Sequence, residues 1–421
     1  MGRDGRTADA RARTSPGGAV GVLDIGTSKI CCLIASATTP PRLLGLGHQR
    51  ARGVKAGIVV DMEEAEQAIR AAIAQAERQA RVTLDGVHVA ISGGQLQSSR
   101  FEASTPAANG VVHHNDMARM IDGARRYAQP DGRTLIHLNT IAYRIDASPN
   151  LAEPRGMSGR MLAADLHAVT AEETAVRNLR LLIERCYLQP ESFVPAGIAS
   201  ARGVATAEEL RGGVIVVDIG AGTTSIAVVA DDQDVFAASI PIGGNHLTFD
   251  IMNATGTPLA EAERIKVLYG TMGEAASDER EIVSYPRLVD TEVELYQITK
   301  AQLRNLIRPR VESLLSQAME KLVAGKMQAY GAKRIVLTGG TAQLLGLPMF
   351  AGRLLDLAVR VAAPLPIAGM APGSSNPAYA TLFGLLAAAA NPATQSLAGR
   401  TSPEEHAGYF GRMGQWLRQS F

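Results

Sequence analysis

Two segments of the chain repeat one pattern that is costly to place in a protein core. Residues 22–35, "VLDIGTSKICCLIA", and residues 216–229, "VVDIGAGTTSIAVV", each join an apolar run to an Asp, then pass through Gly and small hydroxyl residues into a second apolar run. Desolvation destabilises a carboxylate at the end of a buried strand unless that carboxylate faces a ligand. The repeat therefore predicts two β-hairpins whose turns face one ligand from opposite sides.

The predicted turns carry groups that bind phosphate. Glycine lets backbone N–H groups approach an anion closely, and the hydroxyl groups add further donors. Asp24 and Asp218 are poor phosphate ligands, but a carboxylate suits a hydrated Mg²⁺ whose waters bridge to phosphate. For one hairpin alone, an ordinary Gly/Thr-rich turn is the alternative. Two copies in one chain favour a clasp for the triphosphate of a nucleotide, with Lys29 adding positive charge.

A third segment completes a known order of motifs. Residues 336–346, "VLTGGTAQLLG", predict a strand, a Gly-Gly-Thr turn and a helix, which together form a platform for a purine and its ribose. The three segments in this order resemble the ATP-binding superfamily of actin, Hsp70 and sugar kinases. Within it, the chain resembles the FtsA family of bacterial cell division proteins over about residues 20–390 and the C-terminal piece. The segments that carry this resemblance are "PRGMSGRMLAADLHAVT", "FDIMNATGTPLAEAERIKVLYG", "IVLTGGTAQLLGL" and "GRMGQWLRQSF".

The resemblance implies a set of ATP- and Mg²⁺-binding residues, with Mg²⁺ held through water by the two Asp residues. The first phosphate loop is Asp24, Gly26, Thr27, Ser28 and Lys29, and the second is Asp218, Gly220, Gly222, Thr223 and Thr224. Gly243 and Gly244 lie in a loop near the phosphates. Glu263 and Lys266 flank the ribose and base. The adenosine turn is formed by Gly339, Gly340 and Thr341. Ala221 departs from the pattern, because a third glycine is common there. The alternative for Glu263 and Lys266 is a solvated ion pair on a helix.

The implied fold is α/β, a bilobed actin-like (ribonuclease H-like) ATPase fold with an inserted small α+β subdomain and a C-terminal amphipathic helix. The expected parts are a disordered tail (1–19), subdomain 1A (20–94 and 190–212), subdomain 1C for self-association (95–189), subdomain 2A (213–244 and 331–390), a mainly helical subdomain 2B (245–330), a flexible linker (391–406) and the amphipathic helix (407–421).

Local patterns predict several helix ends. Asp61 with Glu64 predicts the start of a helix that runs to about residue 81, and Asn376 with Pro377 predicts the start of the closing helix. The cluster His113, His114 and Asp116 suggests a metal site, but Asn115 as a helix N-cap is the favoured interpretation. His167 is expected to pack within a strand.

The last residues, "AGYFGRMGQWLRQSF", predict a helix with one apolar face. That face comprises Tyr409, Phe410, Met413, Trp416, Leu417 and Phe421, flanked by Arg412 and Arg418. The only Trp of the chain lies in this face. An interfacial helix on anionic lipid explains the aromatic and arginine residues, and docking on the protein's own body is the alternative.

Composition narrows the classes of function. A formal net charge of +1 gives no electrostatic footprint for nucleic acid, and three cysteines give no disulfide framework. The N-terminal residues lack the apolar core of a signal peptide, and the run "LFGLLAAAA" is shorter than the ~20 residues that span a bilayer. We therefore expect a protein that works in the cytoplasm without crossing the membrane.

The resemblance implies a cytoskeletal adaptor rather than an enzyme. Such a protein binds ATP, polymerises, binds the tubulin-like protein FtsZ, anchors the ring at the cytoplasmic side of the inner membrane at the septum, and recruits later division proteins. No water-positioning residue is identified, so any ATP hydrolysis is expected to be slow. The resemblance implies that the C-terminal peptide of FtsZ docks on subdomain 2B. On the helix "TKAQLRNLIRPRVESLL", Arg304, Arg308 and Arg310 would suit an acidic peptide, and a solvated basic face is the alternative. The competing classes are a small-molecule kinase and a type IV pilus adaptor of similar fold.

Overall fold

Each predicted hairpin begins a five-stranded sheet in the computed structural model, which describes residues 18–390 except 149, 290–291, 331 and 372–374. The first sheet has the order β3 (Leu43–Arg50), β2 (Lys29–Ser36), β1 (Ala19–Ile25), β6 (Gly86–Ile91) and β10 (Gln189–Pro195). The second has the order β13 (Gln233–Ile240), β12 (Thr224–Ala230), β11 (Val214–Ile219), β16 (Arg334–Thr338) and β17 (Ala358–Val361). In both sheets three antiparallel strands are followed by two parallel ones, so the two lobes share one topology.

Helices cover both faces of the first sheet. Helices α1 (Met62–Ala80) and α3 (Glu173–Arg185) share a core with Leu23, whereas α10 (Ala380–Ala390) shares one with Val22 on the opposite face. Successive strand residues point to opposite faces, and both faces are covered, which explains why β1 is apolar apart from Asp24 rather than alternating. The predicted start of α1 is confirmed, because Asp61 Oδ1 accepts the N–H groups of Glu63 and Glu64 at 3.0 Å. Short strands β4 (Val54–Lys55) and β5 (Ile58–Val59) precede this helix.

The second sheet is also covered on both faces. Helix α4 (Ala196–Val204) shares a core with Val216, and α8 (Lys300–Ala324) shares one with Val217 on the other face. Helices α5 (Ala207–Gly212) and α9 (Leu347–Leu355) complete this lobe. The predicted cap of the closing helix is confirmed, because Asn376 Oδ1 accepts the N–H of Ala378 at 2.8 Å at the start of the turn that leads into α10.

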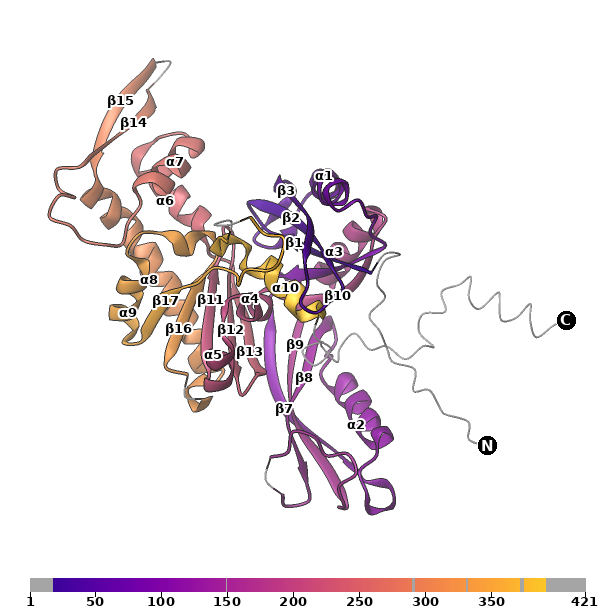
Figure 1. Ribbon diagram of the computed structural model, residues 1–421. Helices are drawn as coiled ribbons and strands as arrows, with labels where there is room; N and C mark the ends of the chain where they lie inside the picture. The colour runs from indigo at the N-terminus through magenta and orange to yellow at the C-terminus, as the bar shows by residue number, and fades with distance from the viewer. Residues whose placement is uncertain (1–17, 149, 290–291, 331, 372–374, 391–421) are drawn as a thin grey trace.

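Helices α4 and α10 cross between the lobes, and each packs on the sheet of the other half of the chain. Helix α4 follows the last strand of the first sheet but contacts β11, β12 and β13, while α10 contacts β1, β2 and β6 (Figure 1). Two glycines allow the helices to touch. A Cβ added to Gly384 would lie 1.6 Å from the carbonyl oxygen of Ala199, and one added to Gly203 would lie 2.5 Å from that of Ala380. The lobes are therefore joined at a crossing without side chains between the backbones.

An antiparallel unit is inserted in the first lobe. Its sheet has the order β7 (Gln97–Pro106), β9 (Met161–Glu172) and β8 (Arg133–Ile145), and α2 (His114–Tyr127) packs on it at the bottom of Figure 1. His167 is fully buried in β9, as predicted. The predicted boundary at residue 189 includes α3, although α3 packs in the core of the first lobe, because its apolar face meets α1.

The predicted N-cap of α2 is wrong. The helix begins at His114, one residue before Asn115, and His113 is the flanking residue. Asp116 is buried and accepts the backbone N–H of His113 at 3.0 Å, with Arg119 2.8 Å away. The carboxylate at the third helical position therefore satisfies the backbone N–H of the flanking residue, as the third residue of a capping box does.

The unit inserted in the second lobe carries a β-hairpin beside its helices. It comprises α6 (Gly244–Thr255), α7 (Leu259–Tyr269) and an antiparallel hairpin of β14 (Ile282–Val289) and β15 (Glu292–Thr299) that leads into α8. The prediction of a mainly helical unit did not include β15. The hairpin projects from the lobe in Figure 1, and the stacked rings of Tyr285 and Tyr296, 6.2 Å apart, join its strands. Such a partly exposed hairpin lacks a long apolar run.

The predicted linker and C-terminal helix, and residues 1–17 of the predicted N-terminal tail, lie outside the described residues. Strand β1 begins at Ala19, within the range predicted for that tail. Among the helices of the described part, none is long and apolar enough to cross a bilayer.

Candidate nucleotide site between the lobes

One cavity of about 260 Å³ is lined by the turns of both repeated hairpins. The predicted residues that line it are Asp24, Gly26, Thr27, Ser28, Lys29, Asp218, Gly220, Gly222, Thr223, Glu263, Lys266, Gly339, Gly340 and Thr341. Thus all three motif segments meet at one place, although they come from different parts of the chain.

Three predicted residues lie behind the cavity wall rather than on it. The Thr224 hydroxyl is fully buried and donates to the Ile242 carbonyl at 2.8 Å. Gly243 and Gly244 lie where α6 begins, directly behind the second turn. A Cβ on Gly243 would lie 2.6 Å from the Gly220 oxygen, so these glycines shape the turn by their lack of side chains.

The two turns touch across the cavity. A Cβ added to Gly222 would lie 2.4 Å from Thr27 Oγ1, so only glycine allows this approach. Asp24 and Asp218 occupy the same position in β1 and β11, just before each turn. Backbone N–H groups, hydroxyls and two carboxylates therefore converge on a space with lobe 1 on one side and lobe 2 on the other.

The two carboxylates are poorly solvated. Burial raises the pKa of Asp24 to about 6, and the nearby charge of Asp218 adds to this rise while Lys29 opposes it. Burial also raises the pKa of Asp218, whereas hydrogen bonds from Ser200 and Thr381 oppose the change. Carboxylates in this state gain stability from a cation. The described residues contain no group of three or more His, Cys, Asp or Glu side chains that could hold a metal directly. Two carboxylates beside phosphate-binding turns are a donor set that fits hydrated Mg²⁺ held through water.

Lys29 lies at the cavity wall. Its ammonium donates to the Ala378 carbonyl, in the turn before α10, and lies 4.0 Å from the centroid of the Tyr379 ring. The positive charge predicted from the first turn is thus at the cavity wall, held against the segment that leads into α10.

On the predicted adenosine side, Glu263 and Lys266 form an ion pair on α7 in which Glu263 is 47% exposed and Lys266 is largely buried. Lys266 is only 12% exposed and contacts Glu263 Oε2 at 2.7 Å and Thr248 Oγ1 at 2.9 Å. Thr341 Oγ1 donates to the Gly220 carbonyl at 2.9 Å, which ties the third motif to the second turn. Gly339 has φ +88°, in the left-handed region that favours glycine.

Several residues that line the cavity were not predicted. They are Ser92, Ala196, Ala221, Ser225, Asn245, Val267, Ala378 and Thr381. Thr381 and Ala196 arrive on the crossing helices, and Asn245 arrives at the start of α6. Ala221 and Ser225 lie within the second repeated segment. No local motif marks the residues on the crossing helices or on α6, because their approach depends on how distant elements pack.

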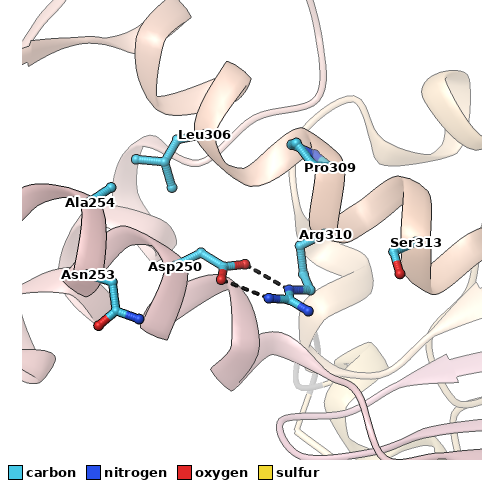
Figure 2. A pocket seen from close by; sticks show the side chains of 7 residues that line it. All are labelled: Asp250, Asn253, Ala254, Leu306, Pro309, Arg310 and Ser313. Atoms are coloured by element: carbon cyan, nitrogen blue, oxygen red, sulfur yellow. Dashed lines mark hydrogen bonds and ion pairs between the residues drawn. The ribbon is translucent and has the colours of Figure 1, made fainter.

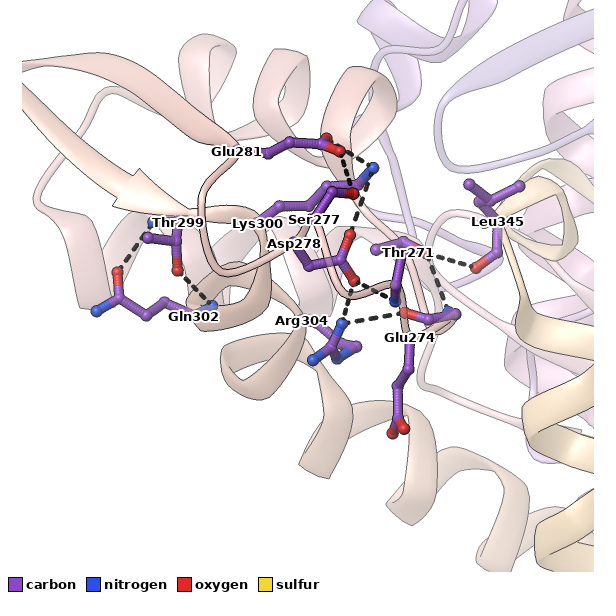
Figure 3. Close-up of polar contacts among 12 residues, drawn as sticks. Thr271, Glu274, Ser277, Asp278, Glu281, Thr299, Lys300, Gln302, Arg304 and Leu345 are labelled. Atoms are coloured by element: carbon purple, nitrogen blue, oxygen red, sulfur yellow. Dashed lines mark hydrogen bonds and ion pairs between the residues drawn. The ribbon is translucent and has the colours of Figure 1, made fainter.

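The three arginines proposed for partner binding differ in accessibility. Arg304 is a correction to the predicted basic face, because its side chain is 13% exposed and binds the buried Asp278 and the Gly273 carbonyl. Figure 3 shows this cluster at the base of the β14–β15 hairpin, where Lys300 also contacts Glu281. Arg304 therefore has a structural role in fixing this loop.

Arg308 and Arg310 are more accessible. Arg308 Nε donates to Glu312 at 2.8 Å, and its side chain is 46% exposed. Arg310 forms two hydrogen bonds with Asp250, at 2.8 and 2.9 Å, beside a groove of about 630 Å³ between α6 and α8 (Figure 2). The groove is lined by Asp250, Asn253, Ala254, Leu306, Pro309, Arg310 and Ser313.

Comparison with known proteins agrees with this arrangement. The profile described as "Cell division protein FtsA" matches residues 215–384, and "SHS2 domain inserted in FTSA" matches residues 93–170. The chain is 33% identical to the cell division protein FtsA of Rhizobium meliloti (strain 1021) over 425 residues, covering 96% of this chain and 95% of that protein. It is 31% identical to that of Escherichia coli (strain K12) over 413 residues, covering 95% and 97%.

Solved structures confirm the predicted actin-like fold. A PilM–PilN type IV pilus biogenesis complex matches with a TM-score of 0.64 at 18% identity, covering 89% of this chain and 99% of that one. MreB5 of Spiroplasma citri bound to ADP matches with a TM-score of 0.54 at 14% identity, covering 88% and 96%. The solved structures share the fold at low sequence identity, whereas the FtsA proteins are 31–33% identical over nearly the whole chain. The chain therefore belongs to the FtsA family of cell division proteins.

Proposed function

We propose that the protein is an ATP-binding adaptor that forms filaments, binds FtsZ, holds the division ring to the cytoplasmic side of the inner membrane and recruits later division proteins. One observation carries the nucleotide part: equivalent turns of two duplicated sheets converge on one cavity, each preceded by a carboxylate. Membership of a cell division family favours this function over that of a small-molecule kinase.

The chain's own groups define how Mg·ATP would be held. The N–H groups and hydroxyls of the turns at Thr27 and Gly222 would bind phosphate oxygens, and Asp24 and Asp218 would hold Mg²⁺ through its waters. The segment around Gly340, with Val267 opposite, would contact the adenosine. Bound Mg·ATP would supply anionic oxygens and a cation that both lobes contact at once.

Replacement of Asp24 by Asn is expected to weaken Mg·ATP binding and to stabilise the nucleotide-free protein. The Mg·ATP affinity should fall at least roughly tenfold, because a charged partner of the hydrated cation is lost. The nucleotide-free protein should become more stable by about 1–2 kcal/mol at pH 7, since a half-buried carboxylate with a pKa of about 6 is replaced by a neutral amide. Calorimetry measures the first effect and urea unfolding the second.

Asp61→Asn is the matched control, because an exposed Asn caps a helix as well as Asp does and lies away from the cavity. It should change neither quantity. Unchanged Mg·ATP affinity in Asp24→Asn would contradict the proposed clasp.

The groove at Arg310 is the proposed site for an acidic C-terminal peptide of FtsZ. Arg310 already holds one carboxylate, that of Asp250, in a two-bond geometry that an incoming carboxylate could adopt. Leu306 and Pro309 supply apolar surface beside it, as Figure 2 shows. Arg308 adds a second half-exposed charge on the same helix.

Two substitutions at this groove should act in opposite directions. Arg310→Glu should weaken FtsZ co-sedimentation at least roughly tenfold at low salt, because an attractive charge becomes repulsive. Asp250→Asn should strengthen it, because Arg310 loses its internal competitor. Arg353→Glu, an exposed reversal on α9, controls for the change of net charge. Equal binding by Arg310→Glu and its parent would show that FtsZ docks elsewhere.

Self-association is proposed to use the inserted β7–β9 unit. This unit has its own core and projects from the first lobe (Figure 1), so it offers a surface outside the cavity. ATP would regulate filament formation through the angle between the lobes.

A further inference from the structure

Two helices that pack on different lobes hold the carboxylate of Asp218. Ser200 Oγ, on α4, donates to Oδ2 at 2.5 Å, and Thr381 Oγ1, on α10, donates to the same oxygen at 2.9 Å. The two hydroxyl oxygens are 2.8 Å apart. Ser200 is fully buried, and Thr381 is 7% exposed. These contacts form a closed cluster of three oxygen atoms where the helices cross.

The cluster fixes which carboxylate oxygen faces the cavity. Both hydroxyls bind Oδ2, and Oδ1 lies toward Gly339, a residue of the cavity wall. A Cβ added to Gly339 would lie 2.3 Å from Oδ1, so the absence of a side chain there leaves room for that oxygen. Oδ1 is therefore the oxygen available to a ligand in the cavity.

One of the two bonds spans the lobes. Asp218 lies on β11 of the second sheet, and α4 packs on that same sheet, so the Ser200 bond stays within the second lobe. Helix α10 packs on β1, β2 and β6 of the first sheet. A change in the angle between the lobes therefore alters the Thr381 bond and leaves the Ser200 bond in place.

We propose that Ser200 and Thr381 are positioning residues for Mg²⁺ in the nucleotide complex. They hold Oδ2 of Asp218 so that Oδ1 points into the cavity, and Thr381 makes this orientation depend on the lobe angle. A cation held near Oδ1 in turn favours the lobe angle at which the Thr381 bond is made, so Mg·ATP stabilises the first turn of α10. This inference rests on the proposed nucleotide function and adds to it a pathway from the cation to the lobe angle.

Substitutions of Thr381 in the full-length protein test the positioning role. Thr381→Val keeps the shape but lacks the donor, whereas Thr381→Ser keeps the donor. Thr381→Val should weaken Mg·ATP binding roughly tenfold, while ATP affinity in EDTA changes by less than about twofold. Thr381→Ser should restore the Mg²⁺ dependence. A merely structural role would lower both affinities together.

Thr255→Val is the matched control. Thr255 is a buried threonine of α6 whose hydroxyl donates to the Ile251 carbonyl at 2.7 Å, away from the cavity. It should bind Mg·ATP as the parent protein does. If Thr381→Val does not fold, Ser200→Ala removes the second donor with a smaller change and carries the same expectation.

Hydrogen exchange gives a second measurement that does not depend on affinity. Mg·ATP should slow amide exchange in the first turn of α10 in the parent protein, and Thr381→Val should abolish this slowing.

Wild-type Mg²⁺ dependence in Thr381→Val, or a failure of Thr381→Ser to restore it, would overturn the inference. Asp218→Ala distinguishes a failure of the proposed nucleotide site from a failure of the positioning role. If it binds Mg·ATP as tightly as the parent, the nucleotide site itself is wrong. If it binds weakly while Thr381→Val binds normally, only the positioning role is wrong.

Discussion

Removal of residues 407–421 is expected to abolish co-sedimentation with anionic vesicles and to leave ATP binding intact. The removed segment carries six large apolar side chains and two arginines at helical spacing. Each apolar side chain gains ~1.5–3 kcal/mol on full burial, but partial insertion and the ordering of the segment offset much of this gain. A single segment should therefore bind lipid weakly, with about 1 kcal/mol from each Arg on anionic lipid. Filaments that link many such segments should bind ~10²–10⁴-fold more tightly.

Point substitutions sharpen this test. Trp416→Glu should lose vesicle binding nearly as completely as the truncation, whereas Trp416→Phe should retain most of it, because it keeps an aromatic ring on the apolar face. Binding should fall as anionic lipid is replaced by neutral lipid. Full vesicle binding by the truncated protein would refute the membrane anchor and favour docking of the segment on the protein's own body.

Gly384→Ala should strongly destabilise the protein, although alanine is the better helix former. The added methyl group would lie 1.6 Å from the backbone oxygen of Ala199, and a backbone atom cannot rotate away as a side chain can. The crossing helices would separate and open the core that contains Leu382 and Val22. We expect a loss of at least about 3 kcal/mol in the free energy of unfolding, measured with urea.

Gly123→Ala is the matched control. Gly123 also lies inside a helix, α2, but an added Cβ there meets no atom within 4 Å. Because alanine has the higher helix propensity, this variant should gain about 0.5–1 kcal/mol. A similar response of the two variants would mean that the helix crossing tolerates a side chain.

Local sequence patterns predicted the turns and the helix cap whose geometry depends on residues close together in the sequence. The Asp-Ile-Gly turns, the Asp61 cap and the Gly-Gly-Thr turn after β16 follow from short-range geometry, and the structure contains them where the patterns indicated. Asn115 failed as a cap, because the helix begins one residue earlier and Asp116, three residues after the flanking residue His113, accepts the N–H of His113. A polar residue just before a helix and a carboxylate in its first turn look alike in the sequence, so the pattern did not distinguish Asn115 from Asp116.

Residues placed by tertiary packing could not be predicted in this way. Ser200 lies in a segment of small residues with no motif, and its contact with Asp218 exists because α4 packs on β11. Arg304 shows the opposite case. Its spacing on α8 places it near Arg308, but the loop of Asp278 folds over it and removes its charge from the surface. Both outcomes depend on contacts between elements that are distant in sequence.

The exchange of covering helices between the lobes has a consequence for folding during synthesis. The first sheet is complete once Pro195 has been made, but α10, which covers the face containing Val22 and Leu33, ends at Ala390. At roughly 5–20 residues per second, that apolar face stays open on the ribosome for about ten seconds or more. The β7–β9 unit buries its own core from neighbouring residues and can fold as soon as it emerges. A nascent chain of this protein therefore presents a folded insertion on a lobe that still exposes an apolar sheet face, which is the kind of surface that chaperones bind.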